Sequence, residues 1–463
     1  MSDMKFGIIL LPLFCLIISQ SIFAQKEENY VRCETHTVDS MLQKSNPKRQ
    51  SRDDFERWIT LKSNDLSNKR TSDTEEYVIP VIVHIFHKGE EIGQGYNISN
   101  AQIQSQILVL NEDFNRRNAD TVKTPSVFQS VAGKLPIRFV LASYDSQGNT
   151  LPEKGVSRRK AEKENYTSLE AIDELIKPNI WNPEKYLNIF VADLKSSTGN
   201  ILLGFAFYPE ASGLEGIEGD PIVGSDDISR SDVDGVVINT KYFGSIFTSF
   251  GNNFDVKSPF QAGRTTTHEV GHWLGLRHPW ADDFSCSTDD FCDDTPAVTT
   301  HHDKYGAKET CKFPGPNQCY PFVENDLADM FQNYMDYTAD TCMNIFTKCQ
   351  VNRMKIVLEN SPRRKELTKN ADFVLSDEDE DSQNIQIFPN PFNDKLNITL
   401  TGSYGEKIYA TVIDAVGQIV WKDSTISTGQ TNWDIDLNKL SLGFYFVNIE
   451  TNKGRVIKKV LKI

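Results

Sequence analysis

The stretch HEVGHWLGLRH, residues 268–278, holds three of the eight histidines of this chain together with a glutamate. In a helix, residues four apart lie on one face, so His268 and His272 can direct imidazole nitrogens toward a single ion about 2 Å away. Glu269 lies beside them, where a carboxylate can accept the proton of an attacking water molecule and later deliver it to a leaving amine. These residue types at this spacing indicate a zinc centre built for hydrolysis.

The residues that follow can complete this centre. Gly275 can adopt a left-handed conformation that other residues avoid, which would end the helix and redirect the chain. His278 can then return as a third zinc ligand and leave the fourth position open, as a hydrolase requires. A chance match to H-E-x-x-H-x-x-G-x-x-H has a probability of roughly one in ten thousand or less. His301 and His302 lie in a polar loop and are expected to face solvent.

Length and charge limit the possible functions. A chain of 463 residues is too long for one ordinary core, so two or more domains are expected. Its formal net charge of -15 argues against nucleic acid or an anionic membrane surface as the main partner, because both repel acidic proteins. An acidic surface does suit the binding of cations.

The N-terminus has the pattern of an exported protein. Residues 1–24 combine Lys5, an apolar stretch and a small residue at Ala24, which predicts a signal peptide; the alternative is a membrane anchor. Residues 25–70 are charged and poor in strand formers, and they end on the basic pair Lys69–Arg70. This composition predicts a removable pro-segment, although a helical arm that stays attached is the alternative. No later segment is apolar enough to span a membrane, so the mature protein is expected to lack a transmembrane segment.

The rest of the chain divides into two predicted domains joined by a linker. Residues 71–365 open on the β-branched run 77–87, a buried strand, and continue with a helical pattern after Ser99 or Asn100. Further strands are predicted in IRFVLASYD, YLNIFVADL, ILLGFAFYP and GVVINTKYF. Residues 366–384 are polar and acidic, which is typical of a solvated linker. Residues 385–463 alternate apolar and polar residues between turns, which predicts a small all-β domain.

The motifs also support a family resemblance. HEVGHWLGLRH resembles the extended zinc motif of the metzincin metalloendopeptidases, and NYMDYT resembles their methionine-containing turn, with Met335 as the turn methionine. With DDTP at 293–296, DTCMNIFT at 340–347 and IPVIVHIF…NEDF, the chain is similar to the pappalysin family over roughly residues 32–360. The resemblance implies an α+β metzincin-like domain with a mixed twisted sheet and an active-site helix, which hydrolyses peptide bonds of extracellular proteins. It further implies that Tyr337 lies near the zinc and stabilises the oxyanion.

A second metal is expected in the acidic loop after the histidine motif. Six aspartates crowd this loop: Asp282, Asp283, Asp289, Asp290, Asp293 and Asp294. Calcium would relieve the repulsion between such carboxylates. The family resemblance implies Asp290, the carbonyl of Cys292 and Thr295 as calcium ligands. The alternative is a plain solvated acidic loop.

Export favours disulfides over free thiols, and six cysteines follow the histidine motif while Cys33 stands alone. The resemblance implies the pairs Cys286–Cys319 and Cys311–Cys342, which leaves Cys292 and Cys349 to bridge each other. Position 349 more often carries glycine in the family, so this third pair departs from its pattern. A second zinc held by thiolates is the rival arrangement.

Two further roles are implied by the resemblance. Cys33 in RCETHT resembles the pro-segment cysteine that blocks zinc in latent members, although Glu34 replaces the usual glycine after it. Members that prefer Lys or Arg after the scissile bond carry an acid at the base of that pocket. Asp340 is the candidate here, with Thr341 as the other possible pocket residue.

The segment 385–463 resembles the C-terminal sorting domain of Bacteroidetes type IX secretion cargo, on PNP, a G-x-Y-F-V-like strand and KKVLKI. This implies the type IX machinery as a partner and an extracellular or outer-membrane surface location. An ordinary carbohydrate- or protein-binding β-sandwich is the alternative for this tail. For the whole chain, the rival to a secreted zinc endopeptidase is a surface binding or adhesion protein with a structural metal site.

Overall fold

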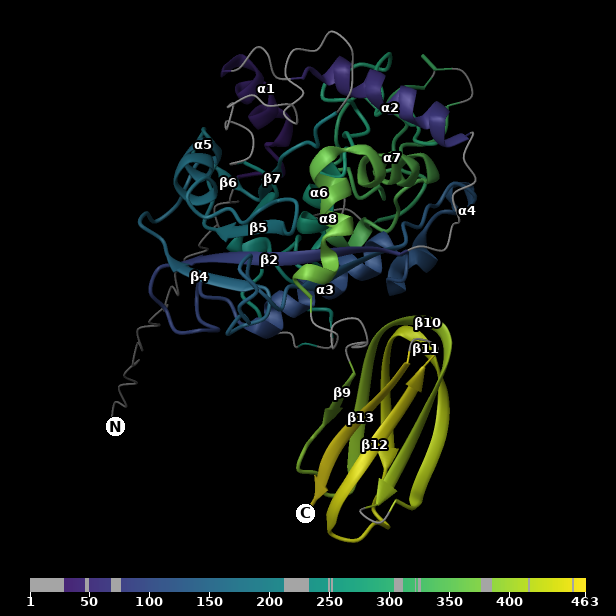
Figure 1. Ribbon diagram of the computed structural model, residues 1–463. Helices are drawn as coiled ribbons and strands as arrows, with labels where there is room; N and C mark the ends of the chain where they lie inside the picture. Colours follow the sequence, from purple (N-terminus) through teal and green to yellow (C-terminus); the bar gives the residue numbers. More distant parts are fainter. Residues whose placement is uncertain are drawn as a thin grey trace, which may run out of the picture.

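The computed structural model (Figure 1) describes residues 29–45, 50–67, 76–211, 233–248, 250, 253–303, 311–320, 322–323, 326–375, 385–414, 417–451 and 454–463. The predicted signal peptide, residues 1–24, lies outside the described residues, as do the basic pair Lys69–Arg70 and the acidic run 376–384. Among the residues that the structure does describe, no helix is both long and apolar enough to cross a bilayer.

A six-stranded mixed sheet forms the centre of the larger unit, as the sequence predicts. Its strands are β2 (Tyr77–His87), β3 (Ile137–Leu141), β4 (Val156–Lys160), β5 (Leu187–Ala192), β7 (Gly204–Ala206) and β8 (Val236–Asn239). They are ordered β3-β2-β5-β8-β7. The first half of β2 pairs with β3, and its second half pairs with β4. All these pairs are parallel except β7 with β8, which is antiparallel.

Four helices supply most of the remaining core: α3 (Asn100–Phe114), α6 (Arg264–Trp273), α7 (Lys348–Asn360) and α8 (Pro362–Lys369). Ser99 caps α3 by accepting a hydrogen bond from the main-chain N–H of Gln102. One hydrophobic cluster joins the sheet to all four helices, which places α6 in the interior of the domain. Shorter helices are α4 (Ser126–Gln129), α5 (Ser168–Glu170), the π-helix Ala171–Ile176 and the 3-10 helices Ala119–Lys123, Thr240–Tyr242, Asp340–Cys342 and Ala371–Phe373.

The structure differs from the sequence prediction at the start of the acidic linker. Residues 366–375 were expected to be solvated, but they continue α8 and the short helix after it. Leu367 and Val374 are fully or almost fully buried against the larger domain. Two apolar side chains in a mostly charged stretch are too few for a periodicity argument, so their burial could not be predicted from the sequence.

The predicted pro-segment forms three elements: β1 (Tyr30–Val31), α1 (Thr35–Ser45) and α2 (Arg52–Ser67). β1 pairs in parallel with β6 (Ile201–Leu202), beside the edge strand β7 of the main sheet. In Figure 1 both purple helices lie at the top of the larger unit, with α2 above α7 and α1 above β6 and β7. Cys33 and Thr35, which follow β1, contact Glu269 of the histidine motif.

The C-terminal residues form an all-β unit, as predicted. Its strands are β9 (Gln386–Phe388), β10 (Lys395–Asp414), β11 (Ile419–Asp436), β12 (Gly443–Thr451) and β13 (Gly454–Lys462). All pairs are antiparallel, and register shifts between Thr401 and Lys407 divide the long pair β10–β11 into two halves. Side chains of both halves share one hydrophobic core, which gives a sandwich-like packing.

Candidate active site

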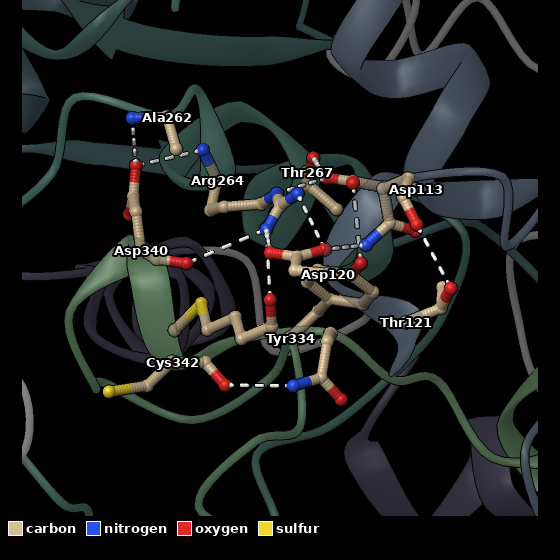
Figure 2. A network of polar contacts seen from close by, with 12 residues as sticks. Asp113, Asp120, Thr121, Ala262, Arg264, Thr267, Tyr334, Asp340 and Cys342 are labelled. Carbon is tan, nitrogen blue, oxygen red and sulfur yellow. Dashed lines mark hydrogen bonds and ion pairs between the residues drawn. The ribbon is translucent and has the colours of Figure 1, made fainter. Parts of the chain in front are cut away.

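Helix α6 carries the first part of the histidine motif and is held at its start by a polar network. The main-chain N–H of Arg264 donates to the Asp340 carboxylate at 3.1 Å. The Arg264 guanidinium forms ion pairs with Asp113 at 2.8 Å and with Asp120 at 3.2 Å (Figure 2). Thr267 also donates to Asp113, at 2.7 Å. These contacts fix α6 against α3 and against the loop that contains Asp340.

Gly275 redirects the chain after α6, as the sequence predicts. Its φ of 87° lies in the left-handed region, which favours glycine. A methyl group at this position would lie 2.9 Å from the Val357 side chain and 3.0 Å from the Phe55 side chain. The sharp turn and the close packing both require glycine here, and the turn returns His278 to the face of α6 that carries His268 and His272.

The three histidines converge on one point. Their Nε2 atoms are 3.2 Å apart between His268 and His278, 3.2 Å between His268 and His272, and 2.9 Å between His272 and His278. All three side chains are buried. Nitrogen lone pairs this close together and shielded from water are arranged as ligands of a single ion rather than as separate core histidines.

Each of these rings is oriented by a hydrogen bond at its other nitrogen. The Nδ1 of His268 lies 2.8 Å from the carbonyl oxygen of Tyr334, and that of His272 lies 2.9 Å from the carbonyl oxygen of Leu276. The Nδ1 of His278 lies 2.6 Å from the Asp282 carboxylate. Such contacts place the proton on Nδ1 and direct Nε2 toward the metal.

Burial also favours the protonation state that binds a metal. It lowers the pKa of His268 and of His272 well below the ordinary value, an effect that the neighbouring imidazoles increase. Neutral imidazole is the form that coordinates zinc. Neutral His268 and His272, whose Nε2 atoms converge with that of His278, therefore fit a zinc ion.

Glu269 lies beside the histidines and is completely buried. Burial raises the pKa of Glu269 to about 8. Its Oε2 accepts a hydrogen bond from the Thr35 hydroxyl at 2.9 Å and one from the Cys33 thiol at 3.4 Å. Its Oε1 has no hydrogen-bond partner among the described residues, although it is buried. An unsatisfied carboxylate oxygen next to a metal site is suited to bind a reacting water molecule.

The pro-segment brings a thiol to the same point. Cys33 is the free cysteine among the described residues, and its sulfur and the three histidine nitrogens all lie within 4.8 Å of one another. Thr35, two residues later, also donates to the general-base candidate Glu269 while it accepts from the N–H of Ala206 at 2.8 Å. Thr35 was not predicted to be a site residue, because nothing in its local sequence indicates a distant carboxylate partner.

The methionine turn lies directly under α6. Met335 is completely buried, and a methyl group at Gly271 would lie 2.5 Å from its sulfur. The Tyr337 ring lies beside the histidines, with ring centroids 5.0 Å from His278 and 5.6 Å from His268. Its hydroxyl donates to the carbonyl oxygen of Cys33 at 3.5 Å. The turn thus brings a phenol donor to the metal centre.

The expectation that His302 faces solvent is wrong. It is 5% exposed, and its ring lies 2.6 Å from Asp336 and 2.9 Å from Asp329. Burial alone would lower the pKa of His302, but these two carboxylates raise it to about 10. Asp336 also accepts from the N–H of Tyr337 at 2.6 Å, so His302 ties its loop to the methionine turn. Its partners are far away in the sequence, which is why local polarity was misleading.

Of the two pocket candidates, Asp340 meets a basic side chain and Thr341 does not. The Arg32 guanidinium of the pro-segment donates to Asp340 at 3.2 Å, and both side chains are buried. Asp340 also accepts from the N–H of Ala262 at 2.9 Å, as Figure 2 shows. Arg32 stacks over the ring of Phe260 at 4.3 Å. Thr341 is exposed.

The acidic loop separates into two groups. Asp282 contacts His278 and therefore belongs to the histidine centre. Asp290 is buried, and the Thr295 hydroxyl oxygen lies 2.6 Å from its carboxylate and 2.7 Å from the carbonyl oxygen of Cys292. Burial raises the pKa of Asp290 to about 7. The three proposed calcium ligands thus lie together.

Three disulfides surround this loop: Cys286–Cys319, Cys292–Cys349 and Cys311–Cys342. They are the pairs named in the sequence analysis, and Cys33 stays outside them. With Cys292 and Cys349 joined to each other, their sulfurs are not free thiolates for a second zinc.

Comparison with known proteins identifies two regions of this chain. Residues 170–359 match the peptidase family model described as pregnancy-associated plasma protein-A. Residues 386–463 match a secretion system C-terminal sorting domain. The fungal extracellular metalloprotease of Arthroderma benhamiae is 40% identical over 95 residues, which is 20% of this chain and 31% of the fungal protein. This chain therefore spans only about a third of the length of that relative. A metalloprotease of Arthroderma gypseum is 26% identical over 63% of this chain and 77% of its own length.

Solved structures give a longer match. Mature mirolysin of Tannerella forsythia, solved with a cleaved peptide, is 37% identical and superposes with a TM-score of 0.52 over 65% of this chain and 99% of that chain. A promirolysin mutant from the same organism is 35% identical, with a TM-score of 0.58, over 74% of this chain and 99% of its own. The pro form thus matches a larger share of this chain than the mature form does.

Proposed function

Because this chain belongs to the pappalysin family of metalloproteases, we propose that it is a secreted zinc metalloendopeptidase that is made as a latent zymogen. The observation that carries the proposal is the convergence of His268, His272 and His278 beside the carboxylate of Glu269. A buried carboxylate with one unpartnered oxygen next to three converging imidazoles is the arrangement that metal-assisted hydrolysis requires.

The residues have distinct roles in this reaction. The three imidazoles hold zinc, which supplies a Lewis acid that acidifies a water molecule and polarises the scissile carbonyl. Glu269 accepts the proton of the attacking water and transfers it to the amide nitrogen that leaves. Tyr337 donates a hydrogen bond to the carbonyl oxygen as negative charge develops there. Its hydroxyl already meets a peptide carbonyl, that of Cys33, which supports this role.

Latency follows from the pro-segment residues that fill the same site. Cys33 offers a fourth ligand to the metal, and Thr35 occupies one oxygen of Glu269. Arg32 pairs with Asp340, the acid that we assign to the substrate pocket. We propose that this segment blocks the metal, the general base and the substrate pocket together. Cleavage that removes the residues through Lys69–Arg70 would free all three.

A closed set of four ligands is also the feature of a structural metal site, which is the rival function. The fourth ligand, however, would come from Cys33, in the segment that we propose is removed. The test is hydrolysis of a quenched fluorescent peptide library by the zinc-loaded chain after removal of the pro-segment. Cleavage supports the endopeptidase. Zinc binding by folded protein without any cleavage would favour the binding or adhesion protein.

We expect the enzyme to prefer Lys or Arg after the scissile bond, because Asp340 is a buried acid that already binds Arg32. Asp340→Asn should lower kcat/KM for an arginine-containing peptide by about a hundredfold, since a charged hydrogen bond in a dry pocket is lost. Thr341→Ala, an exposed neighbour, should keep the preference. A cleavage profile of the unaltered enzyme without Lys or Arg enrichment on the primed side would reject this specificity.

Calcium is proposed as a structural ion held by Asp290, the Cys292 carbonyl and Thr295. Calcium would relieve the cost of burying the Asp290 carboxylate. One of its oxygens now accepts from the Thr295 hydroxyl and the main-chain N–H of Cys292, and the other accepts from the Gln350 side chain. A calcium-selective chelator should therefore lower the melting temperature by about 5 °C, and added calcium should restore it. Asp290→Asn should melt at the lower temperature with or without calcium. An unchanged melting curve after chelation would remove the ion from the account.

The C-terminal match supports a route of export. We propose that a signal peptide in residues 1–24 directs the chain to the periplasm. The sorting domain at 386–463 then engages the type IX secretion machinery of a Bacteroidetes-like bacterium. The enzyme would act outside the cell or on the outer-membrane surface. Deletion of residues 385–463 should retain active enzyme in the periplasm, and unchanged export would contradict this route.

A further inference from the structure

Helix α2 of the pro-segment is anchored to the rest of the larger unit by one buried acid, Glu56. The Glu56 carboxylate accepts hydrogen bonds from Arg353 at 2.7 and 2.9 Å and from Arg277 at 3.2 Å. Glu56 is 6% exposed, and each arginine is 4% exposed. Ion pairs removed from water to this degree are specific, because either charge left alone would be costly.

Apolar side chains enclose this ion pair. Phe55 and Trp58 of α2 are almost completely buried and form one hydrophobic cluster with Ile356 and Val357 of α7. Figure 1 shows α2 and α7 lying in the same upper part of the larger unit. Arg277, Arg353, Ile356 and Val357 together form the arginine cradle, a surface of the protease domain that fits an acid flanked by aromatic residues.

Removal of the pro-segment would leave the arginine cradle without its acid. Among the described residues after position 75, no carboxylate forms an ion pair with Arg277 or Arg353. The Nε of Arg353 also has no hydrogen-bond partner there, although it is buried. Activation would therefore expose two cationic side chains together with the apolar side chains of the cradle. The protein as a whole has a net charge of -15.

We propose that the arginine cradle of the mature enzyme is an exosite, which binds an amphipathic helix of a protein substrate that carries a carboxylate between aromatic residues. The inference rests on the proposed endopeptidase function and deepens it, because it names a feature of the substrate outside the scissile bond. The helix Arg52–Ser67 shows the required pattern, with Glu56 between Phe55 and Trp58.

One polypeptide can bind at the arginine cradle and near the catalytic centre at the same time. The pro-segment reaches Asp340 with Arg32 and the cradle with Glu56. The cradle also adjoins the metal centre directly, since Arg277 stands between Leu276, whose carbonyl orients His272, and the third histidine. A substrate with a helix at a similar distance from its scissile bond could occupy both sites.

The test compares two substrates of the zinc-loaded enzyme obtained by processing the full chain. Each carries a quenched scissile peptide joined through a flexible linker to the sequence of residues 50–67, and in one the glutamate equivalent to Glu56 is glutamine. We expect a KM at least tenfold lower for the glutamate form, with similar kcat. The enzyme variant Arg353→Gln should reduce this ratio to near one, whereas Lys348→Gln, which removes an exposed charge from the same helix, should keep it.

A direct measurement of peptide binding separates failure of the exosite from failure of the endopeptidase function. A fluorescent peptide of residues 50–67 should bind the processed enzyme at least tenfold more tightly than its glutamine form, whether or not any substrate is cleaved. Equal KM values for both substrates would overturn the exosite, even if Arg353→Gln fails to fold. Tight binding that only inhibits cleavage would overturn it too, and would assign the cradle to rebinding of the released pro-segment. Tight peptide binding without hydrolysis of any substrate would instead refute the endopeptidase function and leave only a binding site.

Discussion

The Glu269→Ala variant is expected to lose peptide hydrolysis by about a thousandfold or more while it still binds zinc, because general acid–base catalysis contributes roughly 10²–10⁴ in rate. Glu269 follows the ligand His268 in the sequence, but its carboxylate is not among the side chains grouped as possible metal ligands. Its carboxylate is buried and carries a raised pKa, so its loss should not destabilise the fold. The measurement is kcat/KM on a quenched peptide, with zinc content determined on the same sample.

The design of this comparison must separate catalysis from activation. Since processing can depend on the enzyme's own activity, the pro-segment of parent and variant should be removed by the same added protease. Tyr337→Phe serves as a graded comparison, with an expected fall in kcat of about a hundredfold for one oxyanion donor. A Glu269→Ala enzyme within tenfold of the parent would mean that another group accepts the proton.

The second large effect is expected from Cys33→Ala in the full, unprocessed chain. This change removes the thiol that lies with the three histidine nitrogens, and so it opens the fourth position at the metal. We expect the zinc-loaded variant to become active at least tenfold faster than the parent. Residual latency should persist, because Arg32 still binds Asp340 and Thr35 still donates to Glu269.

The control for latency is Lys44→Ala, an exposed residue of helix α1 in the same segment. It should activate at the parental rate. Adding Thr35→Val to Cys33→Ala should shorten the remaining lag, because it frees the Glu269 oxygen that the hydroxyl now occupies. If Cys33→Ala activates no faster than the parent, the thiol does not maintain latency.

Local sequence was sufficient for the catalytic helix. The four-residue spacing of His268 and His272 and the glycine at 275 determine which side chains share a face and where the helix ends, and the structure agrees on both. Both properties depend on a few neighbouring residues. The β-branched run 77–87 predicted a buried strand for the same reason, and β2 has these bounds.

Contacts between distant segments could not be predicted in this way. Cys33 was associated with the metal only through a family resemblance, since 236 positions separate it from Glu269. His302 was expected in solvent because its carboxylate partners, Asp329 and Asp336, are 27 and 34 residues away. Glu56 offered a detectable signal, an acid between aromatic residues on a helix, but its arginine partners are visible only in the folded chain.

The most direct test of the zinc-dependent endopeptidase is a zinc titration of the processed enzyme. The enzyme is stripped with a chelator, its folding is checked by circular dichroism, and hydrolysis of the peptide library is followed as zinc is returned. We predict that activity disappears on stripping and recovers in proportion to zinc until the metal is stoichiometric with the chain. Hydrolysis that persists in the stripped enzyme, or that is absent from folded and zinc-loaded enzyme, would contradict the account.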